Sequence, residues 1–254
     1  MARNLKIAAV PMVKKQKNAN VTQNLQFLNA GSKWQEYLGA VAKRFNREFE
    51  RDTFELPEEV EAMPIYQEWL MGSLQGRIAS PFWELVKPKK NYDCLDLGCG
   101  VGFLIYPWRD WESNFYGHDI SRFAYDAISS RGPQLNPKLF KKMTFGPAHQ
   151  LDYEPDKFDL AIATGLSCYY PLPYWQDVID AVKLVLKPGA SFVFDVIIED
   201  ADIAENWAIL ETYLGAEVFL ESLSKWDTLI KDSGGKIVKR LTGELFQLYQ
   251  VRFS

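Results

Sequence analysis

Three glycines follow the first strand-like apolar segment of the chain. Gly98, Gly100 and Gly102 come directly after the run Leu-Asp-Leu that contains Asp96. Glycine has no Cβ, so such a turn lets the backbone approach a ligand closely, and amides beyond it can point at the ligand's polar end. Asp119 lies seventeen residues after Gly102, at the end of the next apolar run. A carboxylate there can accept hydrogen bonds from both ribose hydroxyls, so the pair predicts a nucleoside site.

The spacing of these glycines disfavours NAD. A dinucleotide-binding turn has the pattern G-x-G-x-x-G. In this chain the third glycine comes one position early, and Phe103 stands where that pattern has glycine. The nucleoside is therefore expected to belong to another cofactor.

Short apolar runs alternate with helical stretches from residue 92 onward, which is typical of a parallel sheet with crossover helices. Ser121 is the expected N-cap of one helix, which should end at Gly132 and Pro133. A second helix is expected over 174–186, with a turn at 187–189. Strands are predicted at 92–97, 114–119, 142–145, 158–164 and 191–197.

The end of the chain predicts a hairpin. Residues 236–241 and 245–253 have the character of strands, and only three residues separate them. A parallel pair needs a crossover of about a dozen residues or more, so these strands must be antiparallel. The predicted fold is α/β, with a seven-stranded, mostly parallel sheet, helices on both faces and an antiparallel C-terminal hairpin.

Helices are expected before the sheet, and their apolar spacing is clearest over 33–50 and 66–86. We predict that residues 1–65 form a helical arm or lid and that residues 66–254 form the main domain. The lid should close over the carboxyl edge of the sheet and present Arg44 or Arg47 to an acceptor of negative charge; packing for stability alone is the alternative. The apolar stripe of the first helix contains Trp34, Tyr37, Leu38, Val41, Phe45 and Phe49.

Four segments in order carry a family resemblance: 96–102, 117–121, 158–160 and 186–189. Together they resemble the motifs of class I S-adenosylmethionine-dependent methyltransferases, over roughly residues 66–253. The reversed hairpin also fits that family and distinguishes it from ordinary dinucleotide folds. The resemblance implies that the cofactor is S-adenosylmethionine.

The resemblance also implies a set of cofactor-binding residues. Asp96, Gly98 and Gly100 would surround the methionine part, and Asp119 and Ile120 the ribose and adenine. Ala148 would lie at the adenine edge, but Pro147 precedes it where the family often has an acid. His149 or Gln150 could supply the missing polar contact, or apolar packing could hold the adenine. The predicted cofactor-binding set is Asp96, Gly98, Cys99, Gly100, Gly102, Asp119, Ile120, Ala148, His149 and Thr164.

The loop after the fourth strand, residues 165–171, should face the transferable methyl group, because ligands of open α/β sheets bind at the carboxyl edge. The sequence lacks the N/D-P-P-Y/F/W signature of nucleobase and glutamine methylation. Tyr169, Tyr170 and His149 are the candidate catalytic residues, although each tyrosine could equally be a core residue and His149 a surface residue. His118 should point to the opposite face from Asp119, in a structural role.

The composition of the chain limits the classes of molecule that it can bind. The net charge is −4, and residues 1–50 hold nine Lys or Arg against three Glu. The acidic remainder disfavours broad nucleic-acid binding, which needs a basic face. No apolar run is long enough for a membrane span, and the three cysteines form no paired or metal-binding pattern. We expect a cytoplasmic protein without a metal site, and its oligomeric state stays open.

The leading hypothesis is a methyltransferase that acts on a small-molecule acceptor. Methylation of protein or RNA is the second hypothesis, supported by the basic N-terminal segment. A catalytically inactive regulatory protein that binds S-adenosylmethionine is the third. The acceptor and the atom methylated do not follow from the sequence.

Overall fold

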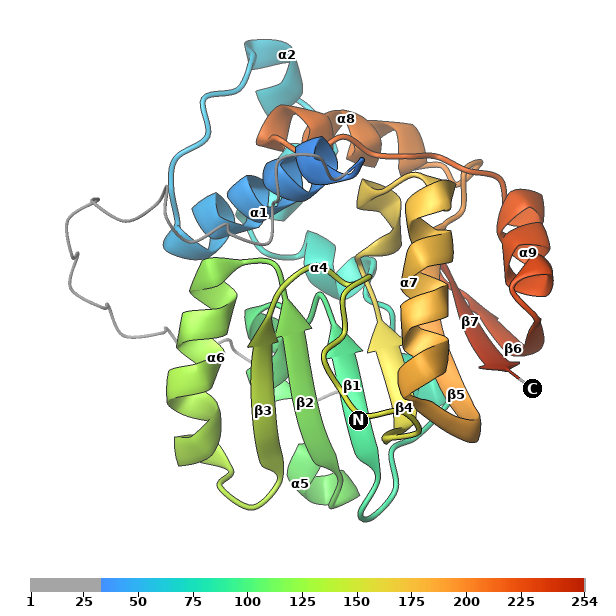
Figure 1. The fold of residues 1–254 in the computed structure, drawn as a ribbon. Helices are drawn as coiled ribbons and strands as arrows, with labels where there is room; N and C mark the ends of the chain where they lie inside the picture. Colours follow the sequence, from blue (N-terminus) through green and yellow to red (C-terminus); the bar gives the residue numbers. More distant parts are fainter. Residues whose placement is uncertain (1–32, 254) are drawn as a thin grey trace.

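A single seven-stranded sheet organises the chain (Figure 1). The structure is a computed structural model, and it describes residues 33–253. The strand order is β3-β2-β1-β4-β5-β7-β6, and only β7 runs antiparallel to its neighbours. This is the predicted fold. The strands are β1 Asp93–Leu97, β2 Asn114–Asp119, β3 Phe140–Phe145, β4 Phe158–Ala163, β5 Leu186–Ile197, β6 Gly235–Thr242 and β7 Phe246–Phe253.

Helices cover both faces of the sheet, because each strand of its centre is apolar on both sides. One face packs under α6 (Arg122–Leu135) and α5 (Trp108–Trp111), and the other under α7 (Leu172–Val185) and α9 (Leu223–Asp232). Ser121 caps α6 as predicted, and its hydroxyl accepts a hydrogen bond from the amide of Ala124 at 3.1 Å.

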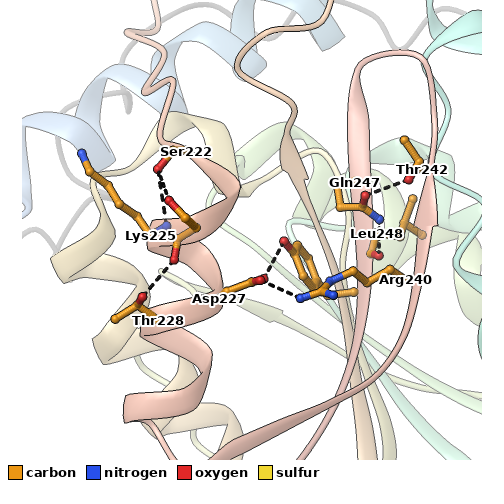
Figure 2. A network of polar contacts seen from close by, with 10 residues as sticks. Ser222, Lys225, Asp227, Thr228, Arg240, Thr242, Gln247 and Leu248 are labelled. Atoms are coloured by element: carbon orange, nitrogen blue, oxygen red, sulfur yellow. Dashed lines mark hydrogen bonds and ion pairs between the residues drawn. The ribbon is translucent and has the colours of Figure 1, made fainter.

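The antiparallel hairpin is fastened to α9 by a polar network (Figure 2). Asp227 accepts hydrogen bonds from Arg240 at 2.7 Å and from the Tyr249 hydroxyl at 3.0 Å. Ser222 caps the start of α9. The edge strand β6 carries Lys236, Lys239 and Arg240, charged residues of the kind that prevent a sheet edge from pairing with another chain.

The N-terminal helix α1 (Gln35–Glu50) and α8 (Ala204–Leu214) lie across the edge of the sheet to which the parallel strands point (Figure 1). Leu38 and Val41 of α1 are almost fully buried in the core of the α7 face. The predicted helix and its apolar stripe are therefore present. Residues 1–32 of the predicted arm lie outside the described residues.

Three expectations about helices were wrong. The stretch 66–86 is divided into α3 (Pro64–Leu70), α4 (Leu74–Arg77) and a 3₁₀ turn (Phe82–Glu84), because Gly72 has a φ of +70° and Pro81 interrupts the backbone bonding. Pro133 does not end α6, which continues to Leu135. The sequence also predicts a helix directly after the glycine turn, but this turn opens only a 3₁₀ helix, Val101–Ile105. A four-residue helix, α2 (Glu58–Glu61), precedes α3.

Candidate cofactor site and its cover

The glycine turn has the backbone geometry that only glycine adopts readily. Gly98 and Gly100 have φ values of +64° and +51°, in the left-handed half of conformational space. A Cβ on Gly98 would lie 3.0 Å from the Leu166 side chain, and one on Gly100 would lie 3.3 Å from the ring of Phe49. Gly102 has no such constraint and has open space around it. The turn therefore depends on the first two glycines.

Asp119 ends β2 directly beside this turn. One carboxylate oxygen accepts a hydrogen bond from the Gly100 amide at 2.7 Å, and the other accepts one from the Ser121 amide at 2.6 Å. Burial raises the pKa of Asp119 to about 6, against the opposing effect of these amides. Each carboxylate oxygen has a second lone pair, so the group can still accept from two ribose hydroxyls.

Asp96 shares a sheet face with Asp119 and Thr164. In the sheet register Asp96 pairs with Gly117 of β2 and Ile162 of β4, and Asp119 and Thr164 lie two residues beyond those partners. Alternate strand residues share a face, so all three side chains lie on the α6 face at the carboxyl edge. Asp96 is 1% exposed, and its Oδ2 atom has no hydrogen-bond partner. A buried carboxylate oxygen without a hydrogen-bond partner, next to the glycine turn, fits a site that binds a polar ligand.

The predicted adenine side lies on the other face. Ile120 and Ala148 are both buried in the core of the α7 face, and Cys99 is buried within the glycine turn. His149 is half-buried, packs edge-on against Tyr174 at 5.1 Å between ring centres, and has its pKa lowered by burial. His118 is fully buried, and its Nε2 lies 3.1 Å from the carbonyl oxygen of Pro147. Burial lowers its pKa to about 4, so a neutral His118 supports the 146–148 loop.

The loop after β4 places Tyr169 and Tyr170 in the interior. They are 4% and 2% exposed; Tyr170 stacks on Tyr174 at 4.2 Å, and Tyr169 packs edge-on against Phe45 of α1 at 5.3 Å. Burial raises the pKa of both phenols well above the usual value. Both are therefore neutral at physiological pH and can donate a hydrogen bond, but they are poor proton acceptors.

Comparison with known proteins gives the family. A model of a methyltransferase domain matches residues 95–192, which contain the glycine turn, Asp119 and the 165–171 loop. Residues 95–192 therefore form a methyltransferase domain, and the motifs and the seven-stranded fold around it resemble those of class I S-adenosylmethionine-dependent methyltransferases. Its cofactor is S-adenosylmethionine.

One curated relative is sterol 4-C-methyltransferase strm-1 of Caenorhabditis elegans, 26% identical over 115 residues. That match covers 45% of this chain and 34% of the relative, so the chain spans about a third of the relative's length.

Solved structures share the fold of this methyltransferase. Geranyl diphosphate C-methyltransferase from Streptomyces coelicolor has a TM-score of 0.64 at 11% identity, covering 88% of this chain and 100% of that one. Magnesium protoporphyrin IX methyltransferase from Synechocystis, solved with S-adenosylmethionine bound, has a TM-score of 0.58 at 15% identity, covering 86% and 97%. At these identities the likeness concerns the fold alone.

In this methyltransferase α1 covers the carboxyl edge of the sheet. Phe49 packs against the glycine turn, and Phe45 packs against Tyr169. The Oδ1 atom of Asn46 accepts hydrogen bonds from the Ser121 hydroxyl at 2.8 Å and from the Phe123 amide at 3.2 Å, so α1 adds a second cap to α6. The helix thus contacts both the glycine turn and the loop expected to face the methyl group.

Arg44 anchors this cover, and it does not present its charge to an acceptor. Its guanidinium is buried and bonds bidentately to Glu211 of α8, with both N–O distances 3.2 Å, and also pairs with Glu48. The expectation that Arg44 faces an anionic acceptor was wrong, because two carboxylates already neutralise it. Arg47 donates instead to the carbonyl oxygen of Thr53 at 2.9 Å.

Sequence reasoning missed Asn46, Glu211 and Asp195. Asn46 stood between two aromatic residues of the predicted stripe and gave no separate signal. Glu211 lies in the segment 204–214, which also holds Glu205 and Asn206, so its charge gave no separate signal. Asp195 interrupts the apolar strand β5, and it is 1% exposed.

The described residues also bear on metal binding and on membrane insertion. No group of three or more His, Cys, Asp or Glu side chains within residues 33–253 could hold a metal ion. None of the helices in that range has the length and apolar character needed to cross a bilayer.

Proposed function

We propose that this protein transfers the methyl group of S-adenosylmethionine to a small-molecule acceptor held between the 165–171 loop and α1. The observation that carries the proposal is the cover itself: Phe45 and Phe49 place an apolar helix face over the loop and the glycine turn. A site closed in this way suits a small acceptor better than an extended RNA or a protein surface.

The similar proteins support the same choice. Their names describe methylation of a sterol, of geranyl diphosphate and of magnesium protoporphyrin IX, which are all small molecules. Protein or RNA methylation becomes the weaker hypothesis, because Arg44 is neutralised within the fold and Arg47 donates to the carbonyl oxygen of Thr53.

The residues of the site have distinct roles in this proposal. Asp119 accepts from the ribose hydroxyls, Ile120 and Ala148 pack against the adenine, and the Gly98 and Gly100 backbone leaves room for the methionine part. When bound, S-adenosylmethionine supplies an electrophilic methyl group on its sulfonium. The protein mainly has to align the acceptor with that methyl group and exclude water, and positioning of this kind can contribute about 7 to 11 kcal/mol.

Proton removal from the acceptor is the remaining step. Tyr170 is neutral and buried, so it can orient an acceptor by donating a hydrogen bond, whereas the Tyr169 hydroxyl already bonds to Glu211. His149 is half-buried and burial lowers its pKa, so its neutral imidazole can accept a proton at neutral pH. We propose His149 as the base where one is needed, with Tyr170 as a positioning group.

We further propose that α1 is a lid that opens for ligand exchange. Only a few of its side chains contact the site: Phe45, Asn46 and Phe49. All three lie on one helix, which ends at the sheet edge before Arg51. A lid of this kind excludes water from the methyl group while it is closed.

Two assays test the function together. Calorimetric titration with S-adenosylhomocysteine measures cofactor binding, and radiolabelled methyl transfer to a panel of small apolar acceptors measures turnover. Binding with transfer supports the proposal. Binding without transfer to any acceptor, small or macromolecular, would favour an inactive regulatory protein. Absence of binding by the folded protein would remove the cofactor assignment.

A further inference from the structure

Two segments of the helical cover carry acidic side chains and no basic ones. Residues 52–76, which contain α2 and α3, hold six acids and no Lys, Arg or His. Residues 199–221, which contain α8, hold seven acids and again no basic residue. α2 packs against α3 and α3 against α8, so the two segments form one surface at the top of Figure 1, the acidic cap. Nine carboxylates of the cap are exposed: Asp52, Glu55, Glu58, Glu59, Glu61, Asp200, Asp202, Glu205 and Glu217.

Most of these exposed carboxylates have no cation beside them. Asp52 lies 4.0 Å from Arg47, and the other eight form no ion pair within residues 33–253. Like charges gathered on one surface repel one another, and together they attract a partner of opposite charge. The cap is therefore a surface that favours a basic partner.

Exposed apolar side chains interrupt the acidic cap. Ile209 and Tyr213 of α8 are 36% and 49% exposed. They are four residues apart, so both lie on the outer face of the helix, one turn beyond Glu205. Leu70 and Met71, at the end of α3, are 56% and 72% exposed. A surface that combines exposed apolar and acidic side chains fits a partner that is both apolar and basic.

The segment of this chain that precedes α1 has the matching composition. Residues 1–32 hold no acid and five basic residues: Arg3, Lys6, Lys14, Lys15 and Lys17. An apolar run over residues 7–13 comes directly before Lys14. The segment therefore combines an apolar part and a basic part in the way that the cap requires.

The same segment is attached to the chain close to the cap. Tyr37, near the start of α1, packs edge-on against Phe219 of the cap, with 5.4 Å between ring centres, and Arg44 bonds to Glu211. α8 thus lies along α1, a helix of 16 residues that is about 24 Å long. The residues from 17 to 33 can span roughly 50 Å when extended, so Lys17 can reach any part of α8. Because the tether is covalent, docking would be intramolecular and would not depend on protein concentration.

We propose that residues 7–17 of this chain dock on the acidic cap. Their apolar run contacts Ile209 and Tyr213, and Lys14, Lys15 and Lys17 pair with the carboxylates around these side chains. Since the chain continues from this segment into α1, docking ties α8 to the start of α1 above the sheet edge. The basic charge of the N-terminal segment then neutralises this protein's own cap.

Zero-length carbodiimide cross-linking of the full chain tests the contact, because the reagent joins a lysine amine to a carboxylate only when the two groups touch. A mixture of unlabelled and ¹⁵N-labelled protein distinguishes links within one chain from links between two chains. We expect links from Lys14, Lys15 and Lys17 to carboxylates of the cap, within one chain. Raising the salt from 0.1 to 1 M shortens the Debye length from about 10 to about 3 Å, so the yield should fall by about fivefold.

Neutral variants separate the cap from acidic surface in general. Tryptic cleavage after Lys14, Lys15 and Lys17 should become about tenfold faster in the cap variant, as expected from the loss of three surface ion pairs. The cap variant combines Glu58→Gln, Glu59→Gln and Glu61→Gln. A matched control removes the same charge from the exposed loop before β4 and should leave the cleavage rate unchanged. The control combines Asp152→Asn, Glu154→Gln and Asp156→Asn.

A further variant tests the apolar part of the contact. Ile209→Ser combined with Tyr213→Ser leaves every carboxylate of the cap in place. We expect it to reduce the yield of the cross-links by about fivefold, because the apolar run loses its contact surface. Both side chains are exposed, so the variant should fold like the wild-type protein.

Links that join labelled to unlabelled chains would show that a second copy occupies the cap, and would overturn the inference. Absence of links to the cap, or links that go instead to Asp152, Glu154 or Asp156, would overturn it as well. So would tryptic rates that respond equally to the cap variant and its control. Cross-linking of the wild-type protein and its salt dependence need no variant, so the test remains decisive if a variant does not fold.

Discussion

The buried ion pair between Arg44 and Glu211 offers the sharpest test of how α1 docks. The Arg44 side chain is 1% exposed and that of Glu211 is 7% exposed. Replacing Arg44 with Met keeps most of the apolar stem but leaves Glu211 buried without its main partner. Removal of one member of a buried pair costs about 3 to 5 kcal/mol, a large part of the roughly 5 to 15 kcal/mol that stabilises a domain.

The double variant Arg44→Met with Glu211→Leu should behave differently. It removes both charges of the Arg44–Glu211 pair, so Glu211 is no longer an unpaired buried carboxylate, and the lost attraction is offset by the desolvation that is no longer required. We expect it to recover most, and not all, of the free energy of unfolding that Arg44→Met loses, because the Tyr169 hydroxyl that bonds to Glu211 loses its acceptor. Glu48 loses its i,i+4 partner in both variants, so this loss cancels when the two variants are compared.

Urea unfolding with linear extrapolation measures both variants, and the single variant Glu211→Leu completes a double-mutant cycle. The pH dependence gives a second signature. Burial already raises the pKa of Glu211 above its usual value, and removing Arg44 raises it further. The single variant should therefore recover stability as the pH falls below neutral, since the folded state then binds a proton that the unfolded state releases. A loss below about 1 kcal/mol in Arg44→Met would show that the pair is solvated and that α1 does not dock as described.

The remaining predictions concern the cofactor. Asp119→Ala should weaken S-adenosylmethionine binding by about 1.5 to 3 kcal/mol in a calorimetric titration, because two charge-assisted hydrogen bonds are lost; unchanged affinity in a folded variant would remove Asp119 from the site. Gly100→Val should abolish binding, because a branched residue is strained at a φ of +51° and meets Phe49; methyl transfer at the wild-type rate would refute the glycine-turn assignment. On acidification from pH 7 toward pH 5, cofactor affinity should fall while the stability of the free protein rises. Asp119 has a pKa of about 6 when folded and about 3.8 when unfolded, so protonation stabilises the folded state but removes the carboxylate that is proposed to accept from the ribose hydroxyls; parallel changes in both measurements would contradict this.

The sheet and the cofactor edge could be predicted from the sequence because their signals are local. Each strand is a short apolar run bounded by turn residues, and the positive φ values of Gly98 and Gly100 were implied by the glycines themselves. Gly102 shows the limit of that argument. It matched the family's motif, yet its surroundings are open and its backbone is of the ordinary kind.

Long-range pairings could not be predicted in the same way. Arg44 lies on an apolar helix face. The sequence shows no partner for its charge, so an acceptor of negative charge was the predicted partner. Its actual partner, Glu211, is 167 residues away, on a helix that the periodicity analysis did not find. Likewise, only the sheet register, in which Ile162 pairs with both Asp96 and Val193, shows that Asp195 and Asp96 lie on the same face of the sheet.

The position of α1 also changes what removal of residues 1–50 can show. The sequence alone suggests that such a truncation leaves cofactor affinity within about tenfold while removing most of the turnover, as expected of a detachable lid. In the structure the same truncation exposes the core residues that Leu38 and Val41 cover. It also leaves Glu211 buried without Arg44, so it should destabilise the whole domain. Phe49→Ala and Asn46→Ala are the cleaner changes, because both contact the site without belonging to that buried pair. We expect them to speed dissociation of S-adenosylhomocysteine in stopped-flow measurements while the unfolding midpoint changes little. If dissociation is unchanged in both folded variants, α1 is part of the core and the gate of this site lies elsewhere.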